Sequence, residues 1–429
     1  MQMNITRCEQ RQDADTWVLC PQCDRVSRLP SLNAGMRAVC PRCHETLSTR
    51  WPQPAKRPTA YALSALFMLV LANLFPFISM EVAGIRSAIT LTRIPGVMVS
   101  DDFQPLAAIF MVLVQVIPAT CLLIIILMVN RVAMPHGLRV LLGRVFCHLR
   151  NWGMAEIFMA GVLVSFVKLM AYGHLDLGIS FWPWCLFCLL QLRAFQSVDK
   201  RQMWHFITPQ LPTFKTPVAG KGGMAQGLRL CSCCTAILPA EKPQCPRCFT
   251  RGYVRKRQSL QWTLALLLTS VMLYIPANIM PIMITDALGS KMPSNIMAGV
   301  VLLWSDGSYP VALIIFIASI MVPSLKILAI GWLCWNASGR GRRDNEKMHL
   351  VYEVVEFVGR WSMIDVFVIA ILSSLVRMGG LMNIYPASGA LLFAAVVILT
   401  MFAALTFDPR LLWDRETDHS VEDTAVETQ

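Results

Sequence analysis

Charged residues are scarce in this 429-residue sequence. They make up 15% of it, against about 25% in an average soluble domain, whereas 55% of the residues are hydrophobic. No phosphate-binding GxxxxGK[ST] motif occurs, and the polar first 50 residues do not have the pattern of a cleavable signal peptide. These features argue against a soluble monomer, a chain that hydrolyses ATP itself and a secreted disulfide scaffold.

Long apolar runs fill most of the remaining sequence. Eight runs of about 20 residues alternate with polar segments, and a helix of that length crosses the hydrocarbon core of a bilayer. The sequence therefore predicts an all-α polytopic membrane protein with eight transmembrane helices in two four-helix repeats. The expected spans are residues 58–78, 106–129, 152–172, 179–195, 260–284, 309–335, 361–377 and 381–407.

The net charge of +12 is explained mainly by the loops between these spans. Residues 131–150 carry four arginines and no acid, and residues 251–257 carry three arginines and a lysine. The alternate loops lack this excess: residues 81–102 carry three acids and two arginines, and residues 282–307 carry two acids and one lysine. Because cytoplasmic loops carry the excess of Lys and Arg, we expect both termini and the central polar segment to lie in the cytoplasm. The charge needs no nucleic-acid partner.

The second half of the chain repeats the first at a separation of about 205 to 211 residues. CPRC at 40–43 recurs at 245–248, and the Asn-x-x-Pro segment at 73–76 recurs at 278–281. A parallel repeat predicts two halves related by an axis near the membrane normal. The expected domains are a zinc ribbon at 1–55, a four-helix repeat at 56–198, a second ribbon with linker at 199–256, a second repeat at 257–408 and a cytoplasmic tail at 409–429.

Nine cysteines gather in two polar segments, and eight of them form CxxC pairs. Two such pairs separated by 10 to 20 residues are typical of a zinc ribbon, in which four thiolates close one tetrahedral site. We expect two structural Zn²⁺ ions, although iron also fits four thiolates. A redox CxxC is the other interpretation of a single pair, and the role of the extra Cys233 stays open. The expected ligands are Cys20, Cys23, Cys40, Cys43, Cys231, Cys234, Cys245 and Cys248.

Ionisable residues inside a span are costly and therefore candidates for function. Lys326 lies in the middle of the sixth expected span, and Ser319 precedes it by two helical turns. Asp365 lies one turn into the seventh span, where it could pair with Lys326 across helices. Asp365 could equally pair with Arg360 near the cytoplasmic end.

Three further polar residues belong to this candidate set, although each also has a purely structural interpretation. Lys168 lies near the outer end of the third span and could extend its ammonium to the interface. Glu156 is the repeat counterpart of Asp365, and Thr400 in the eighth span could simply bond its own backbone. The repeat counterpart of Lys326 is Cys121, so the two halves differ at this position.

Several long strings resemble the paraquat-inducible protein A family of Gram-negative inner-membrane proteins. They run from CPQC at 20–23 through RPTAYALSALFMLVLANLFPF at 57–77 and VGRWSMIDVFVIAILSSLVRMGG at 358–380 to FDPRLLWD at 407–414. The resemblance implies the inner-membrane component of an envelope-spanning phospholipid transport system. Its implied partners are a periplasmic MCE-domain tunnel protein and, indirectly, an outer-membrane lipoprotein.

The resemblance also implies a polar network within the membrane, as in a related subfamily. The matching positions are Lys168, Ser319, Lys326, Asp365 and Thr400, whereas an acidic position of the relatives falls on Ala171. We expect a pocket between the halves that exchanges phospholipid with the tunnel protein, without covalent chemistry. A transporter for small molecules or redox-cycling cations, and a scaffold that binds partners through its ribbons, are the competing hypotheses.

Overall fold

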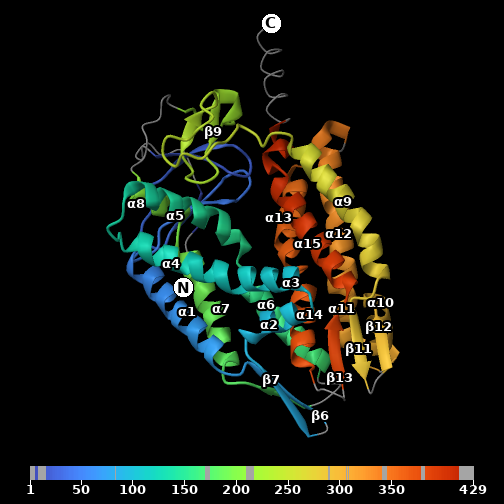
Figure 1. Ribbon diagram of the computed structural model, residues 1–429. Coiled ribbons are helices and arrows are strands. Elements are labelled where there is room, and N and C mark those ends of the chain that lie inside the picture. Colours follow the sequence, from blue (N-terminus) through green and yellow to red (C-terminus); the bar gives the residue numbers. More distant parts are fainter. Residues whose placement is uncertain are drawn as a thin grey trace.

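Most of the described chain is helical. The computed structural model describes residues 5–7, 16–82, 84–169, 174–208, 217–287, 290–305, 307, 309–340, 345–377 and 382–414. Figure 1 shows two groups of helices beside each other, with small cysteine-rich modules at one end and longer strands at the other. The chain forms the group α1 to α8 before the group α9 to α15.

The first helix group contains a 26-residue helix, Gln104–Val129, that includes a π-helical segment. In a π-helix the N–H of each residue bonds to the carbonyl five residues earlier, and Pro118 has no N–H to donate to the carbonyl of Leu113. The Leu113 carbonyl accepts from Met154 N at 3.1 Å instead. The elements are α1 (Lys56–Leu74), α2 (Arg93–Ser100), α3 (Gln104–Phe110), η1 (Met111–Val116), α4 (Ile117–Val129), α5 (His136–Leu149), η2 (Arg150–Trp152), α6 (Ala155–Leu169), α7 (Phe181–Ser197) and α8 (Lys200–Ile207).

The second helix group repeats this order, again with a π-helical segment that ends two residues before a proline, Pro323. Its elements are α9 (Ser259–Ile279), α10 (Ile296–Ser305), α11 (Tyr309–Phe316), η4 (Ile317–Met321), α12 (Val322–Trp335), η5 (Asn336–Arg340), α13 (Asn345–Trp361), α14 (Ile364–Leu375), α15 (Ser388–Thr406) and η6 (Pro409–Leu412). The short helix η3 (Met224–Gln226) belongs to the second cysteine module. Asn73 and Asn278 show the same equivalence, since each amide donates to the carbonyl four residues earlier at 2.8 Å.

Five helices of the described residues are long and apolar enough to cross a membrane. They are α1, the continuous helix Gln104–Val129, α9, the continuous helix Ile317–Ser338 and α15. The helices α6, α7 and α14 contain 15, 17 and 12 residues, which is shorter than a straight span needs. Length and composition therefore support five of the eight expected spans, and the other three remain predictions.

The expectation of an all-α protein holds only in part: most of the described chain is helical, but loops between the helices pair into sheets. Two antiparallel three-stranded sheets form, in the orders β7-β6-β8 and β12-β11-β13. Their strands are β6 (Ile78–Val82), β7 (Ile85–Ile89), β8 (His174–Leu177), β11 (Met283–Ala287), β12 (Ser290–Ser294) and β13 (Met382–Pro386). Pairing satisfies backbone N–H and C=O groups that the helices leave free. It also shortens the first, fifth and eighth expected spans, which included Ile78, residues 283–284 and residues 382–386.

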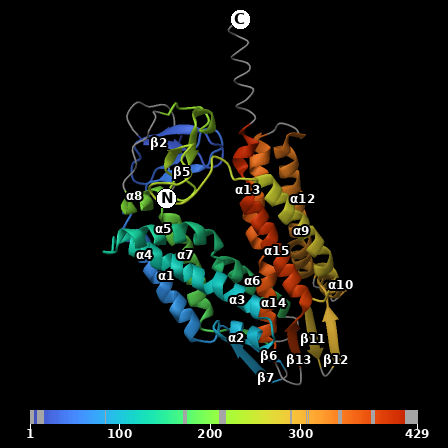
Figure 2. The ribbon, with the colours of Figure 1, turned by 45° about the horizontal axis from the view of Figure 1, so that its top comes forward.

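The remaining strands are short and belong to the cysteine modules, apart from β1 at the amino end, which pairs with β4. They are β1 (Ile5–Arg7), β2 (Thr16–Leu19), β3 (Val26–Leu29), β4 (Arg37–Val39), β5 (Thr46–Thr49), β9 (Leu228–Leu230) and β10 (Ile237–Pro239). Figure 2 shows both modules together at one end of the helix groups. Backbone hydrogen bonds join them, from Val26 N to Lys221 O and from Gly220 N to Val26 O.

The two helix groups meet along α6 and α14, which lie next to each other in both views (Figures 1 and 2). A Cβ on Gly161 of α6 would lie 3.2 Å from the Cβ of Phe367 on α14, so the helices approach closely only because this position is glycine. Phe158 packs edge-on against the Phe367 ring at 5.9 Å. This contact is close-packed, and any pocket between the halves must lie away from it.

Candidate functional site

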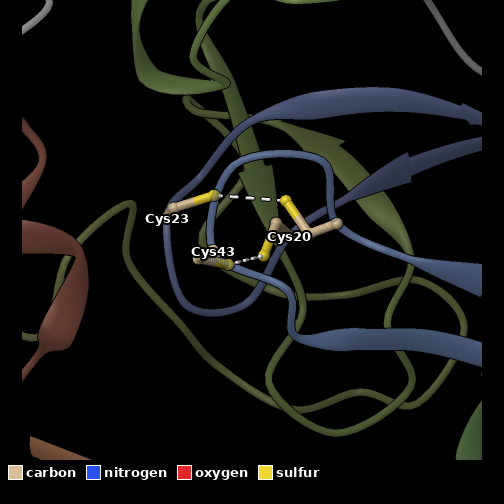
Figure 3. A group of neighbouring side chains, drawn as sticks. Cys20, Cys23 and Cys43 are labelled. Atoms are coloured by element: carbon tan, nitrogen blue, oxygen red, sulfur yellow. Dashed lines mark hydrogen bonds between the residues drawn. The ribbon is translucent and has the colours of Figure 1, made fainter. Parts of the chain in front are cut away.

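The first cysteine module holds its four thiols on two tight turns. Cys20 and Cys23 lie on the turn between β2 and β3, and Cys40 and Cys43 lie on the turn between β4 and β5. In each turn the first cysteine N–H bonds to the carbonyl five residues later, as from Cys20 to Arg25 at 3.0 Å. Figure 3 shows the side chains of Cys20, Cys23 and Cys43 converging from the two turns.

The second module repeats this geometry with Cys231, Cys234, Cys245 and Cys248. The residue after each CxxC pair has a positive φ, between 55° and 60°, at Asp24, His44, Thr235 and Phe249. Four equivalent turns therefore present the eight expected cysteines. The side chain of Cys233 is outside the quartet, although the residue is buried and its carbonyl accepts from the thiol of Cys147 at 3.3 Å.

Both quartets fit a tetrahedral metal ion. All four sulfurs of each group lie within 4.8 Å of one another, and the nearest pairs are 3.4 to 3.5 Å apart. Four sulfurs at about 2.3 Å from a zinc ion would be about 3.8 Å apart, so a small outward shift closes the site. All the described cysteines are free thiols, and the quartets supply four ligands each. They can therefore each hold one metal ion in a closed, structural site.

The first module also contacts both helix groups through polar side chains. Toward the first group, Asp199 before α8 accepts from Ser48 Oγ at 2.7 Å. Toward the second group, Asp24 accepts from Arg255 Nη2 at 2.8 Å, and Arg255 Nε donates to Asp414 Oδ2 at 2.9 Å. Burial disfavours the charged guanidinium and lowers the pKa of Arg255, but the attraction of the Asp24 and Asp414 carboxylates is stronger, so the net effect is a raised pKa.

A second candidate site surrounds Lys326 on α12. The residue is 3% exposed, and its ammonium donates to Thr400 Oγ1 on α15 at 3.0 Å and to Gly359 O on α13 at 3.3 Å. Thr400 Oγ1 in turn donates to Val397 O at 2.9 Å, so its lone pairs remain directed at the lysine. An ammonium has three N–H donors, and described acceptors take two of them.

The other expected polar residues lie around this site to different degrees. Ser319 in η4 and Asp365 in α14 are buried, but no described hydrogen bond joins either of them to Lys326. The cross-helix pair of Lys326 with Asp365 is not among the ion pairs of the described residues, so neutral oxygens hold the lysine instead. Glu156 is exposed in the first turn of α6, and the side chain of Lys168 lies outside the described residues.

Sequence reasoning did not identify Gly359, which is essential to the geometry of the lysine site. A Cβ at this position would lie 3.1 Å from both Nζ and Cε of Lys326. Glycine therefore lets the lysine pass α13 and reach Thr400. Comparison of the two halves of the repeat could have pointed to it. Gly359 corresponds to Arg150 in the first half and Lys326 corresponds to Cys121, so the halves differ at both positions.

Comparison with known proteins places the chain in a family. The model of the paraquat-inducible protein A family matches residues 55–208 and 260–417, which together cover both helix groups. The chain belongs to the paraquat-inducible protein A family. It is 65% identical to the intermembrane transport protein PqiA of Escherichia coli K12, over 95% of this chain and 98% of that protein. PqiA of Shigella flexneri matches to the same extent.

More distant relatives match over nearly the same length. The lipophilic envelope-spanning tunnel protein A of Escherichia coli K12 is 30% identical over 92% of this chain and 90% of its own. A probable intermembrane transport protein of Haemophilus influenzae is 28% identical over 92% of this chain and 96% of its own. No solved structure matches the chain. The family is therefore established over both repeats by sequence alone.

Proposed function

We propose that this chain is the inner-membrane component of a system that moves phospholipid between the two membranes of a Gram-negative envelope. The proposal rests mainly on the 65% identity, over 95% of the chain, to a protein named for intermembrane transport. The more distant relative named as part of an envelope-spanning tunnel supports a lipophilic cargo. A periplasmic MCE-domain tunnel protein is the proposed direct partner, and an outer-membrane lipoprotein is the indirect one.

We further propose that α6, α7 and α14 complete eight spans, with both termini and both cysteine modules in the cytoplasm. The loop charges support this orientation, because residues 131–150 and 251–257 lie at the same end as the modules. Zinc is the proposed ion of each quartet, held by Cys20, Cys23, Cys40 and Cys43 and by Cys231, Cys234, Cys245 and Cys248. Its chemistry there is structural, since four thiolates leave no position for a substrate.

Lys326 is the proposed centre of the transport site, with Thr400, Ser319, Asp365, Lys168 and Glu156 as candidate members of its network. Its ammonium is buried among neutral acceptors, and no carboxylate of the described residues pairs with it. A phosphate oxygen would supply both the missing charge and the third acceptor. The same observation disfavours transport of cations, because a buried ammonium repels them.

Phospholipid transfer in a reconstituted system tests this proposal. The protein and its tunnel partner would be placed in donor vesicles that contain a fluorescent phospholipid, and its appearance in acceptor vesicles would be followed. We expect the complete complex to accelerate transfer and Lys326→Ala to lower the rate at least 10-fold. Lys221→Ala, which removes an exposed lysine from the second module, is the matched control and should retain the rate.

Each outcome separates the hypotheses. No acceleration by the complete complex, together with uptake of a labelled dication, would favour the cation transporter. Equal transfer by wild type and Lys326→Ala would remove the lysine from the mechanism while leaving lipid transport intact. Full transfer after deletion of both cysteine modules would exclude the scaffold hypothesis.

A further inference from the structure

A short sequence pattern recurs where each helix group ends. Asp-x-Arg-x-x-Trp occurs at 199–204 and again at 408–413, a separation of 209 residues. In both copies the aspartate accepts from the backbone N–H two residues later, at 3.0 and 3.2 Å, and so caps the helix that follows. Each copy ends in a buried tryptophan, Trp204 or Trp413. We call these two stretches the first and the second Trp segment.

The second cysteine module lies against the first Trp segment and its surroundings. Arg247 of the CPRC turn is 2% exposed and donates from Nη2 and Nε to Thr208 O, directly after α8, at 2.8 and 3.2 Å. The thiol of Cys147 on α5 donates to Cys233 O at 3.3 Å, and the ring of Trp204 packs against the same helix. The second module therefore rests on α5 and α8 of the first helix group, which precedes it in the chain.

The first cysteine module lies against the second Trp segment. Arg42 has the same place in its CPRC turn as Arg247, and its guanidinium carbon is 4.4 Å from the centroid of the Trp413 ring. The four cysteines of the first quartet share a buried cluster with Trp413 and with Met348 and Tyr352 in the first half of α13. This module therefore packs on the second helix group, although Arg42 and Trp413 are 371 residues apart in the sequence.

The first module also contacts the first helix group, but through its strands. Ser48 Oγ on β5 donates to Asp199 Oδ2 at 2.7 Å, and Arg201 Nη2 donates to Trp17 O on β2 at 3.1 Å. The CPRC turn itself, which holds half of the first quartet, contacts the second helix group. Chain order alone would instead pair each module with the helix group that follows it.

We propose that each CPRC turn, held in shape by its metal, docks its module on a Trp segment, so that each module supports the helix group of the opposite half. The first module thereby fastens the amino end of the chain to its carboxyl end. A short polar module of this kind depends on its metal for folding, so loss of the metal should also remove the docking surface.

The first module is the one that bears on the lysine site. The helix α13 begins beside this module and carries Gly359 further along, where the carbonyl accepts from Lys326 at 3.3 Å. The proposal rests on the proposed metal occupancy of the quartets, but not on phospholipid being the transported cargo.

Amide hydrogen exchange of the full-length protein in detergent tests the docking, with native mass spectrometry of the same samples to count bound metal. We expect Cys40→Ser to lose one metal ion and to speed exchange at least about 10-fold in the first half of α13 and in the second Trp segment, while α5 and α8 stay as in the wild type. Cys245→Ser should also lose one metal ion but loosen α5 and α8, with α13 unchanged.

Further variants separate docking from general damage. Cys185→Ser changes a half-buried thiol of α7 outside both quartets, and it should keep both metal ions and wild-type exchange. Trp413→Ala should keep both metal ions but loosen the first half of α13. If Trp413 is the docking contact, adding Cys40→Ser to Trp413→Ala should raise α13 exchange much less than Cys40→Ser does alone.

The outcomes distinguish this docking from the metal sites themselves. Loss of one metal ion with faster exchange in the helix group that follows each module, or equally in both groups, would overturn the docking and leave the metal sites intact. A wild-type protein without bound metal would refute the proposed occupancy and the docking with it. Fully additive effects in the double variant would refute Trp413 as the contact.

Discussion

Gly359→Ala provides the sharpest test of the lysine site. The new methyl group would lie 3.1 Å from Nζ and Cε of Lys326, which is closer than nine in ten real contacts of a Cβ. The end of the lysine would have to shift by a few tenths of an ångström, which would weaken its hydrogen bonds to Gly359 O and Thr400 Oγ1, now at 3.3 and 3.0 Å. Hydrogen bonds to a charged group contribute about 1.5–3 kcal/mol each, so the loss should cost roughly 3 kcal/mol.

This cost is the opposite of what helix propensity predicts. Gly359 lies inside α13, where alanine is favoured over glycine by about 1 kcal/mol. The matched control is Gly331→Ala on α12, where the added Cβ would meet only Leu267 at an ordinary 3.5 Å. We expect the control to be neutral or stabilised in detergent-solubilised unfolding, while Gly359→Ala is destabilised and loses transport.

A double-mutant cycle decides whether the lysine is the cause. In a Lys326→Ala background the obstructing side chain is absent, and Gly359→Ala should then be harmless. Coupling of roughly 3 kcal/mol between the two positions supports the contact. The same destabilisation with and without the lysine would refute the reasoning, because the glycine would then be required for some other approach to α13.

Three further changes test other parts of the structure. Arg255→Met should lower stability by about 3 kcal/mol, measured by thermal unfolding, because it leaves the buried Asp24 carboxylate unpaired. Gly161→Leu should cost about 1–3 kcal/mol through overpacking of the α6–α14 contact, whereas Gly299→Leu, with open space around it, should cost little. Cys40→Ser should reduce bound zinc from the expected two ions per chain to one, measured by elemental analysis, and an unchanged content would contradict the first quartet.

The cysteine quartets could be predicted because their ligands are defined locally. Cys20 and Cys23 lie on one turn, and so do Cys40 and Cys43, so the CxxC spacing alone determines how each pair is presented. Only the meeting of the two turns requires tertiary structure. The second module was harder, because Cys233 offered another ligand, and three-dimensional placement was needed to exclude its side chain from the quartet.

The sheets could not be predicted for the opposite reason. β6 pairs with β8, whose residues lie about 95 positions further along the chain, and β11 pairs with β13 at a similar separation. A five-residue strand has too little periodicity to be recognised in isolation. Ile78 therefore counted as the end of an apolar span, although in the structure it begins a strand.

The lysine site shows the same division between local and distant information. Lys326 was recognisable because a charge within an apolar run is unusual. Gly359 was not, because its requirement arises from a side chain 33 residues away and glycine within a helix carries no such signal by itself. The possible pair with Asp365 is absent from the described contacts of Lys326 for a related reason: sequence places both residues in spans but does not determine which oxygen the ammonium reaches.

The two halves of the repeat place their buried cation at different positions. In the second half, Lys326 extends from α12 past Gly359. In the first half Cys121 takes the lysine position, and the cation comes from Arg150 at the glycine position. Arg150 donates to Phe195 O at 2.7 Å and to Val198 O at 3.4 Å, and it thereby satisfies carbonyls at the end of α7. One cation thus closes a helix end, while the other has a third N–H donor that no described acceptor takes, which is why we propose that the two halves contribute unequally to transport.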